Sequence, residues 1–202
     1  MQLPLKMKKL YRIAENIGEG ISVMTSILQS VSDLMRTQTA VISPHIYSVE
    51  IASMLKKCIA HWKLLSKALQ DIHFIADETL SQLLNIQANE EYLTIIIEQL
   101  LQNASQYSSK DSTITVEVSH IGEVALVTIR DEGIGISKEK LDGLFEFFQR
   151  ADQHREMGEV RGLGIGLGIV KMYCDAMQCD IHVESLGENQ GTTFSLQFPI
   201  AN

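Results

Sequence analysis

Cysteine and clusters of basic residues are scarce in this sequence. Its 202 residues include three cysteines, Cys58, Cys174 and Cys179, at scattered positions without metal-ligand spacing. An odd number of isolated cysteines is typical of reduced cytoplasmic thiols. The formal net charge is −8, and Lys and Arg form no block, which argues against nucleic acid as a partner. We therefore expect a cytoplasmic chain that does not bind nucleic acid.

Long apolar runs are also missing. None approaches the roughly 20 residues that cross a bilayer as a helix. Lys6, Lys8 and Lys9 interrupt the start of the chain, where a signal peptide would need an apolar core and a cleavage site. The hydrophobic fraction of 45% and the charged fraction of 21% are ordinary for a globular protein. We expect one substantial domain with a helical extension and no membrane contact by this segment.

An apolar stripe with heptad spacing begins at Leu10 and predicts one long helix to about residue 38. Its steps of three and four place the members on one helical face. These members are Leu10, Ile13, Ile17, Gly20, Met24, Ile27, Val31 and Leu34. A stripe this long exceeds what a small domain usually covers, which favours packing against a partner chain. Pro44 ends a polar turn after the helix.

Beyond Pro44 the hydrophobic periodicity switches between helical and strand spacing. It predicts helices over 47–70, 89–107 and 137–144, and another from the glycine-rich stretch to about 177. It predicts strands over 71–77, 84–88, 113–120, 123–131, 180–185 and 192–199. This order suits an α+β sandwich, with a sheet covered by helices on one face.

Glycine alternates with apolar residues just before the last predicted helix. The glycines are Gly162, Gly164, Gly166 and Gly168. A residue without Cβ lets backbone N–H groups approach an anion closely, and a helix N-terminus adds positive partial charge. The stretch is a candidate phosphate cradle, although a flexible loop or a glycine-rich buried strand would show the same spacing.

Two polar positions accompany this stretch. Asp131 ends a predicted strand and is followed by Gly133 and Gly135; its carboxylate can accept a hydrogen bond from an exocyclic amine, and the glycines let a flat base approach the backbone. Asn103 lies four residues after Gln99 on one helical face, and its side-chain oxygen suits a hard cation such as Mg²⁺. An ordinary Asp-Gly turn and a satisfied helical Asn remain open alternatives.

The segment from Gln149 to Arg161 is polar and has no periodicity. Structureless loops of this length are often lids. Arginines on a lid, such as Arg150, can close over phosphates; a solvated loop is the alternative.

Four motifs in this order resemble the ATP-binding catalytic domain of sensor histidine kinases. Residues 99–104 resemble the N box, Asp131-x-Gly133-x-Gly135 the first glycine box, residues 145–148 the F box and residues 162–168 the second glycine box. The resemblance covers about residues 43–200. It implies the Bergerat ATP-binding fold, a two-layer α/β sandwich with a mixed sheet, over residues 41–202. It makes residues 1–40 a partial dimerisation helix, the second of the phosphoacceptor hairpin.

The resemblance also implies an ATP and Mg²⁺ site. Asn103 would coordinate Mg²⁺ and act in catalysis together with Gln99, and Asp131 would bind the adenine amino group. The ATP-binding residues it implies are Asn103, Gln106, Tyr107, Asp131, Gly133, Gly135, Ile136, Phe148, Arg150, Gly162, Leu163, Gly164, Ile165, Gly166, Leu167 and Thr193.

The implied function is transfer of the ATP γ-phosphoryl group to a histidine outside this segment, for relay to the receiver domain of a response regulator. A homodimer through the N-terminal helix, and a cytoplasmic location within a larger membrane-bound sensor, would accompany it. The family's phosphoacceptor box is absent, Gln106 stands where a basic residue is common, and Gly168 replaces the usual Ala. The alternatives are a degenerate nucleotide-binding or partner-binding module without kinase activity, and an anti-sigma-type serine kinase.

Overall fold

The computed structural model describes residues 45–66, 70–76, 84–147 and 164–201. The helix expected over 10–38 and the loop expected over 149–161 lie outside the described residues. Eleven elements follow in this order: β1 (Tyr47–Glu50), α2 (Ile51–Leu65), β2 (Asp71–Ala76), β3 (Asn85–Ala88), α4 (Glu90–Tyr107), β4 (Thr113–Ile121), β5 (Val124–Arg130), α5 (Lys138–Leu141), α6 (Gly166–Ala176), β6 (Asp180–Glu184) and β7 (Thr193–Pro199).

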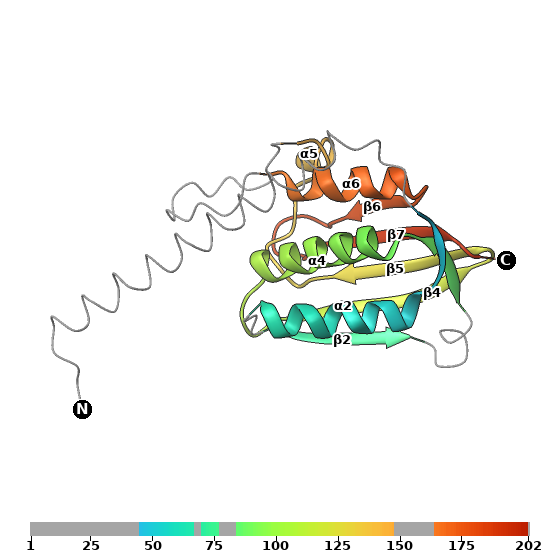
Figure 1. The fold of residues 1–202 in the computed structure, drawn as a ribbon. Coiled ribbons are helices and arrows are strands. Elements are labelled where there is room, and N and C mark those ends of the chain that lie inside the picture. Colours follow the sequence, from blue (N-terminus) through green and yellow to red (C-terminus); the bar gives the residue numbers. More distant parts are fainter. Residues whose placement is uncertain (1–44, 67–69, 77–83, 148–163, 202) are drawn as a thin grey trace, which may run out of the picture.

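A mixed five-stranded sheet forms one layer of the molecule (Figure 1). Its strand order is β2-β4-β5-β7-β6. Only the β2–β4 pair is parallel, and the other three pairs are antiparallel. The β4–β5 hairpin turns at Gly122, whose φ is +59°, as the alternating pattern predicted. A two-stranded antiparallel sheet of β1 and β3 lies beside the main sheet, joined through a bridge between Ile86 and Ile200.

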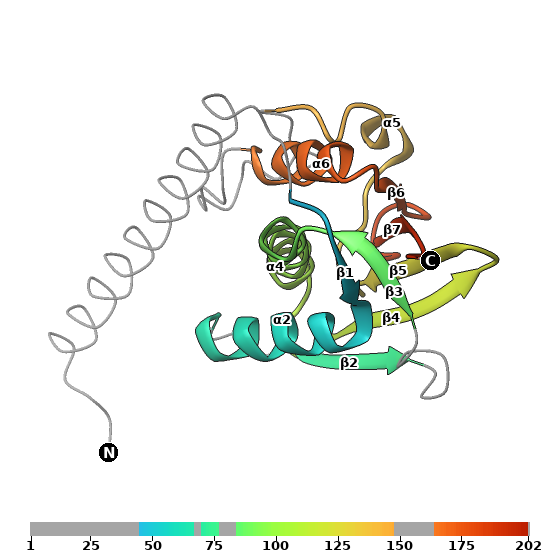
Figure 2. The ribbon, with the colours of Figure 1, turned by 45° about the vertical axis from the view of Figure 1, so that its right-hand side comes forward.

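Helices α2, α4 and α6 form the second layer, and all three cover the same face of the sheet (Figure 2). Helix α4 lies between the other two. It begins at Asn89, whose side chain accepts a hydrogen bond from the Tyr92 N–H at 3.0 Å, and Glu90 and Glu91 occupy its first turn. The Asn89 cap and the two acidic residues both favour a helix that begins here. The α+β sandwich with helices on one face is therefore confirmed.

The core lies between the layers and is mostly aliphatic. In β4, β5 and β7, alternate residues are buried against the helices. Leu93, Ile96, Ile97, Leu100 and Leu101 of α4 are fully buried in the same cluster. Their spacing of three and four residues makes them one wide apolar face of α4, which packs on the sheet.

The helix expected from residue 47 begins later, so that prediction is wrong over its first four residues. Residues 47–50 form β1, in which Val49 pairs with Ile86 and is buried. Glu50 then caps α2 by accepting a hydrogen bond from the Ser53 N–H at 3.0 Å. The helix ends at Leu65, before the expected residue 70, with the Ser66 N–H donating to the Trp62 carbonyl. Helix α5 is also shorter than expected, and Gly143 (φ +81°) follows it.

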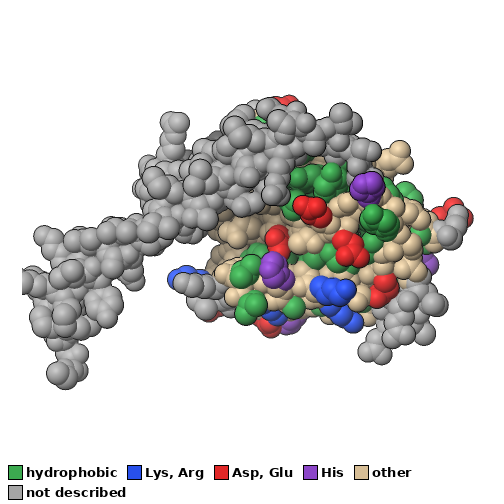
Figure 3. Space-filling model, in the orientation of Figure 1, with side chains coloured by type: hydrophobic (Ala, Val, Ile, Leu, Met, Phe, Trp, Pro, Cys, Tyr) green, Lys and Arg blue, Asp and Glu red, His purple; other side chains and the backbone are tan. Residues whose placement is uncertain are grey.

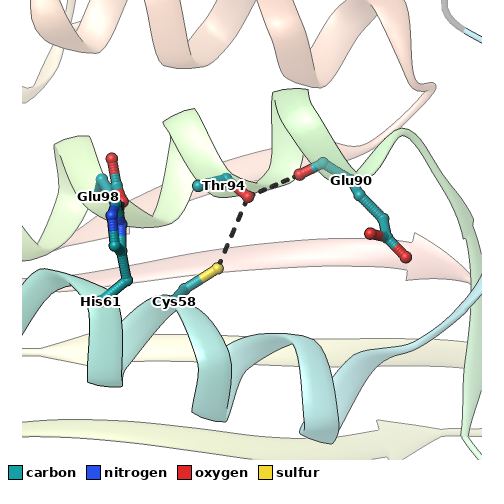
Figure 4. A network of polar contacts seen from close by, with 5 residues as sticks. All are labelled: Cys58, His61, Glu90, Thr94 and Glu98. Carbon is teal, nitrogen blue, oxygen red and sulfur yellow. Dashed lines mark hydrogen bonds and ion pairs between the residues drawn. The ribbon is translucent and has the colours of Figure 1, made fainter.

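Polar side chains join α2 to α4 along their shared boundary (Figure 4). His61 lies 2.7 Å from Glu98, measured from Nδ1 to Oε1, and both side chains are partly exposed. The Cys58 thiol donates to the Thr94 hydroxyl, which itself donates to the Glu90 carbonyl at 2.7 Å. Exposed ion pairs contribute about 0–1 kcal/mol to stability. The buried apolar contacts between α2 and α4 therefore contribute most of the stabilising free energy.

The helical face carries charges of both signs (Figure 3). Within the described part of the chain, no helix combines the length and apolarity that a bilayer-spanning segment needs.

Candidate functional site

Asp131 is the buried carboxylate of the candidate site. It follows the end of β5 and is 5% exposed. Its Oδ1 accepts hydrogen bonds from the Gly133 N–H at 2.8 Å and the Thr192 N–H at 3.2 Å. Burial raises the pKa of this carboxyl, and the two backbone donors offset part of the increase. Both donors bind Oδ1, so Oδ2 is left to accept a hydrogen bond from a ligand.

Close backbone contacts explain the glycines around Asp131. A Cβ on Gly133 would lie 2.8 Å from Asp131 Oδ1 and would overlap the Tyr107 carbonyl at the end of α4. A Cβ on Gly135 would overlap the Gly187 carbonyl, and one on Gly191 would overlap the Asp131 carbonyl. Gly135 and Gly191 also have positive φ, +68° and +69°. The turn after β5 therefore packs against the β6–β7 loop at distances that only glycine allows.

Helix α4 carries Gln99 and Asn103, which are both partly buried. A Cβ on Gly166 would lie 2.6 Å from Gln99 Oε1, so the Gln99 side chain touches the first residue of α6. Asn103 lies one helical turn further along the same face. Gln106 and Tyr107 complete the last turn of α4, and both are partly buried.

The N-terminus of α6 has no side-chain cap. Gly164 has a φ of +70°, and Ile165 precedes the first helical residue without capping it. The N–H groups of Gly166, Leu167 and Gly168 lie in the first turn, where an α-helix provides no internal partners. An uncapped helix start of this kind favours anions such as phosphate.

The structure places two further residues that the sequence singled out, Ile136 and Thr193. The Ile136 N–H donates to the Ser185 hydroxyl at 2.9 Å. Thr193 begins β7, pairs with Arg130 of β5 and is partly buried, whereas the next residue, Phe194, is buried in the core. Phe148, Arg150, Gly162 and Leu163 lie outside the described residues.

Two residues that contact the site were not expected from the sequence. Thr192 is buried, and its backbone both donates to Asp131 Oδ1 and accepts from the Asp131 N–H at 2.9 Å. Because the backbone of Thr192 makes both contacts, no side-chain pattern in the sequence marks it. Ser108 follows α4 and lies against Gly133; its burial depends on tertiary packing, and no sequence signal marks it.

Comparison with known proteins agrees with this arrangement. Residues 88–202 match the family of histidine kinase-, DNA gyrase B-, and HSP90-like ATPases. Sensor histidine kinase YkoH of Bacillus subtilis is 36% identical over 125 residues, which make up 62% of this chain and 27% of that protein. The adaptive-response sensory kinase SasA of Gloeothece citriformis is 29% identical over 203 residues, covering 98% of this chain and 47% of that protein. The chain therefore spans less than half the length of these relatives.

Solved structures share the fold. The crystal structure of full-length ShkA in complex with AMPPNP has a TM-score of 0.72 and 21% identity, and the match covers 100% of this chain and 40% of that one. The histidine kinase AdeS of Acinetobacter baumannii has a TM-score of 0.63 and 18% identity, with 100% and 88% covered. The family match covers more than half of the sequence, and the chain belongs to the histidine kinase-, DNA gyrase B-, and HSP90-like ATPases.

Proposed function

We propose that this chain is the ATP-binding catalytic part of a two-component sensor histidine kinase. The arrangement along α4 carries the proposal. The Asp131 turn contacts the helix at Tyr107, and the start of α6 contacts it at Gln99. Eight residues of α-helix separate these two points by about 12 Å, which is the scale of one nucleotide from its base to its phosphates.

Each end of this site suits one part of ATP. Asp131 Oδ2 accepts a hydrogen bond from the exocyclic amine of adenine, and the glycines around it let the turn pack closely enough to hold this carboxylate in place. At the other end, the N–H groups of Gly166, Leu167 and Gly168 donate to phosphate oxygens.

The residues present fit Mg²⁺ as a cofactor. Asn103 lies on α4 one turn after Gln99, the residue that contacts the first residue of α6. Its neutral amide oxygen is a hard ligand, and the usual partners of Mg²⁺ in such sites are substrate phosphates and water. Bound Mg²⁺ supplies charge that offsets the negative phosphates. Asn103 positions it, and Gln99 holds the neighbouring helix start against α4.

In the proposed reaction, an imidazole nitrogen of a histidine outside this segment forms a bond to the γ-phosphorus. The bond from that phosphorus to the bridging oxygen breaks, and ADP leaves. The described residues supply no covalent nucleophile for this step. Their role is to hold the nucleotide in line and to donate hydrogen bonds to the phosphates.

The partners follow from the same proposal. The phosphoryl group would pass from the histidine to a response regulator receiver domain. The apolar stripe over residues 10–38 would form a homodimer, with residues 1–40 as a partial dimerisation helix and 41–202 as the catalytic domain on the cytoplasmic side. Light scattering on the full chain tests the dimer: the double variant Ile17→Lys/Ile27→Lys should halve the mass of a dimeric chain.

Calorimetric titration with Mg-ADP tests the nucleotide site. We expect saturable binding that weakens at least about tenfold in Asn103→Ala, since each factor of ten is about 1.4 kcal/mol. Gln102→Ala is the matched control, because Gln102 is the exposed neighbour on the same helix. If the folded wild-type chain binds no Mg-ADP, the proposal is wrong.

A degenerate module that binds nucleotide without transferring phosphate is the second candidate. This candidate is favoured by Gln106, a neutral residue at the end of α4 where a basic side chain is common in the family. Incubation with γ-labelled ATP and a histidine-bearing dimerisation helix separates the two. Acid-labile label on that helix supports the kinase. Acid-stable label would indicate a serine kinase, and binding without any label would indicate the degenerate module.

A further inference from the structure

The hydroxyl of Ser108 is a buried polar group that lacks a partner. Ser108 follows the last residue of α4 and has extended backbone angles, φ −113° and ψ 159°. Its Oγ is shielded from solvent and makes no hydrogen bond to any residue that the structure describes. Most buried hydroxyls are paired, because an unpaired one loses its hydrogen bonds to water without replacement.

The position of this hydroxyl connects it to the base end of the candidate site. A Cβ on Gly133 would lie 2.9 Å from Ser108 Oγ and 2.8 Å from Asp131 Oδ1. The two oxygens therefore border the same glycine. The Ile134 N–H donates to the Tyr107 carbonyl at 3.1 Å, so the turn is held against the end of α4 at the residue before Ser108.

The nearby serines differ in this respect. Ser105 donates its hydroxyl to Gln70 Oε1 at 2.9 Å, and Ser112 donates to the Ser109 carbonyl at 2.7 Å. The hydroxyls of both residues therefore have partners within the chain. The unpaired hydroxyl is the one beside the carboxylate.

A hydroxyl next to a carboxylate complements the edge of adenine. Adenine presents an amine donor at N6 beside an acceptor at N1, whereas guanine and hypoxanthine present an acceptor at O6 beside a donor at N1. The Asp131 carboxylate can only accept, and the Ser108 hydroxyl can donate. Ser108 as a whole is only partly buried, so rotation about its Cα–Cβ bond moves the oxygen towards the open side of the residue.

We propose that Ser108 is a second adenine-reading residue, whose hydroxyl donates to N1 of the base, directly or through one water, when nucleotide binds. The inference rests on the proposed ATP site. Nucleotide binding then gives the hydroxyl the partner that it lacks in the free chain. Removing the hydroxyl should leave the free chain as stable as before, or more stable, while weakening its affinity for adenine nucleotides.

The test combines one substitution with one change in the ligand. Mg-ADP and Mg-1-deaza-ADP, in which C–H replaces N1, are titrated into the wild-type chain, Ser108→Ala and the control Ser109→Ala. We expect the wild type and Ser109→Ala to prefer ADP about tenfold, the effect of one hydrogen bond near the upper end of the usual range. Ser108→Ala should bind both ligands alike, at the wild-type affinity for 1-deaza-ADP.

Three results would overturn the inference. The first is a Ser108→Ala variant that keeps the wild-type preference for ADP. The second is a lower melting temperature of the nucleotide-free variant, which would assign Ser108 a structural role. If Ser108→Ala does not fold, Ser108→Cys replaces it, because the thiol fills the site but is a much weaker donor. The third is a folded wild type that binds neither ligand, which ends the proposed function as well. Wild-type binding that Asp131→Asn abolishes but Ser108→Ala leaves unchanged rejects only Ser108.

Discussion

The ring of Phe147 occupies the space that a side chain at Gly168 would need. A Cβ on Gly168 would lie 2.6 Å from Cδ1 and 2.8 Å from Cε1 of that ring. Gly168 is buried in the first turn of α6, and Phe147 is 37% exposed. The aromatic segment after α5 therefore rests directly on the helix that begins the candidate phosphate site.

Gly168→Ala should consequently destabilise the chain. Overpacking costs about 1–3 kcal/mol, while the better helix propensity of Ala returns at most about 1 kcal/mol. We expect a net loss of about 1 kcal/mol in the free energy of unfolding, measured by urea denaturation. The control is the same substitution in a Phe147→Ala background, where the obstructing ring is gone and Ala at 168 should stabilise the chain. An equal loss in both backgrounds would show that the ring is not the cause.

The substitution Asp131→Asn should weaken nucleotide binding without lowering the stability of the fold. Asp131→Asn keeps an oxygen for the Gly133 and Thr192 N–H groups and removes a buried charge, so the melting temperature at neutral pH should not fall. Mg-ADP affinity should fall about 10- to 100-fold, because a hydrogen bond to a charged group is lost and an amide donor would face the adenine amine. Glu132→Gln, at the exposed neighbouring acid, should bind Mg-ADP like the wild type. A large loss of stability in Asp131→Asn would contradict the proposed cost of the charge.

The raised pKa of Asp131 also gives a pH dependence with a definite sign. A carboxyl whose pKa is higher in the folded state holds its proton more tightly there than in the unfolded chain. This group therefore destabilises the fold above its native pKa, and that cost disappears as the pH falls towards about 3.9, the unfolded value. Lower pH therefore favours the fold but weakens nucleotide binding, since the protonated carboxyl is a weaker acceptor. Titrations from neutral pH downwards should show Mg-ADP affinity falling, and Asp131→Asn should lack this dependence.

Two glycines with similar backbone angles should respond differently to substitution. Gly122 has a φ of +59° with no atom within 4 Å of a built Cβ, whereas Gly135 has a φ of +68° and its Cβ would overlap a backbone carbonyl. Gly122→Ala should cost about 1–2 kcal/mol, the price of a left-handed L-residue. Gly135→Ala adds a clash that no rotamer relieves, so its unfolding free energy should fall further. Equal losses in urea denaturation would mean that the β6–β7 loop moves aside freely.

The layers of the fold were predictable because periodicity is strong in α4, β4, β5 and β7. Their apolar faces read unambiguously as helix or strand. Strand β1 was not predictable, because four residues before a helical pattern fit either period, and Glu50 is not among the residues that usually cap helices. The strand is defined by its pairing with β3, which is a tertiary contact.

The candidate site was predictable to the extent that it depends on glycine and on charged or amide side chains. Gly133, Gly135 and Asp131 mark a turn whose chemistry is local. Thr192 and Thr193 are adjacent threonines, and Thr192 contacts Asp131 through its backbone N–H and carbonyl, so side-chain chemistry does not distinguish the two. Ser108 depends on how the turn packs against α4, which no local pattern records.

The three thiols should resist modification in the folded chain. Cys58, Cys174 and Cys179 are each no more than 2% exposed. Burial raises the pKa of the Cys58 thiol, and for Cys179 a hydrogen bond with the Cys174 thiol is the larger cause, followed by burial. Gln178, two residues after the end of α6, has a φ of +55°. The Cys179 N–H then donates to the Cys174 carbonyl at 2.9 Å, which brings the last two cysteines together. Thiolate is the reactive form, so both access and ionisation are suppressed.

Iodoacetamide labelling at mildly alkaline pH, followed by peptide mass spectrometry, tests this expectation. The native chain should remain unmodified while the chain in guanidinium gains three adducts. A Ser109→Cys variant controls for reagent activity, because position 109 is exposed and should be labelled at once in the native state. Rapid labelling of Cys174 and Cys179 in the native chain would show that the end of α6 opens locally, and that this end of the helix is less stable than its buried contacts indicate.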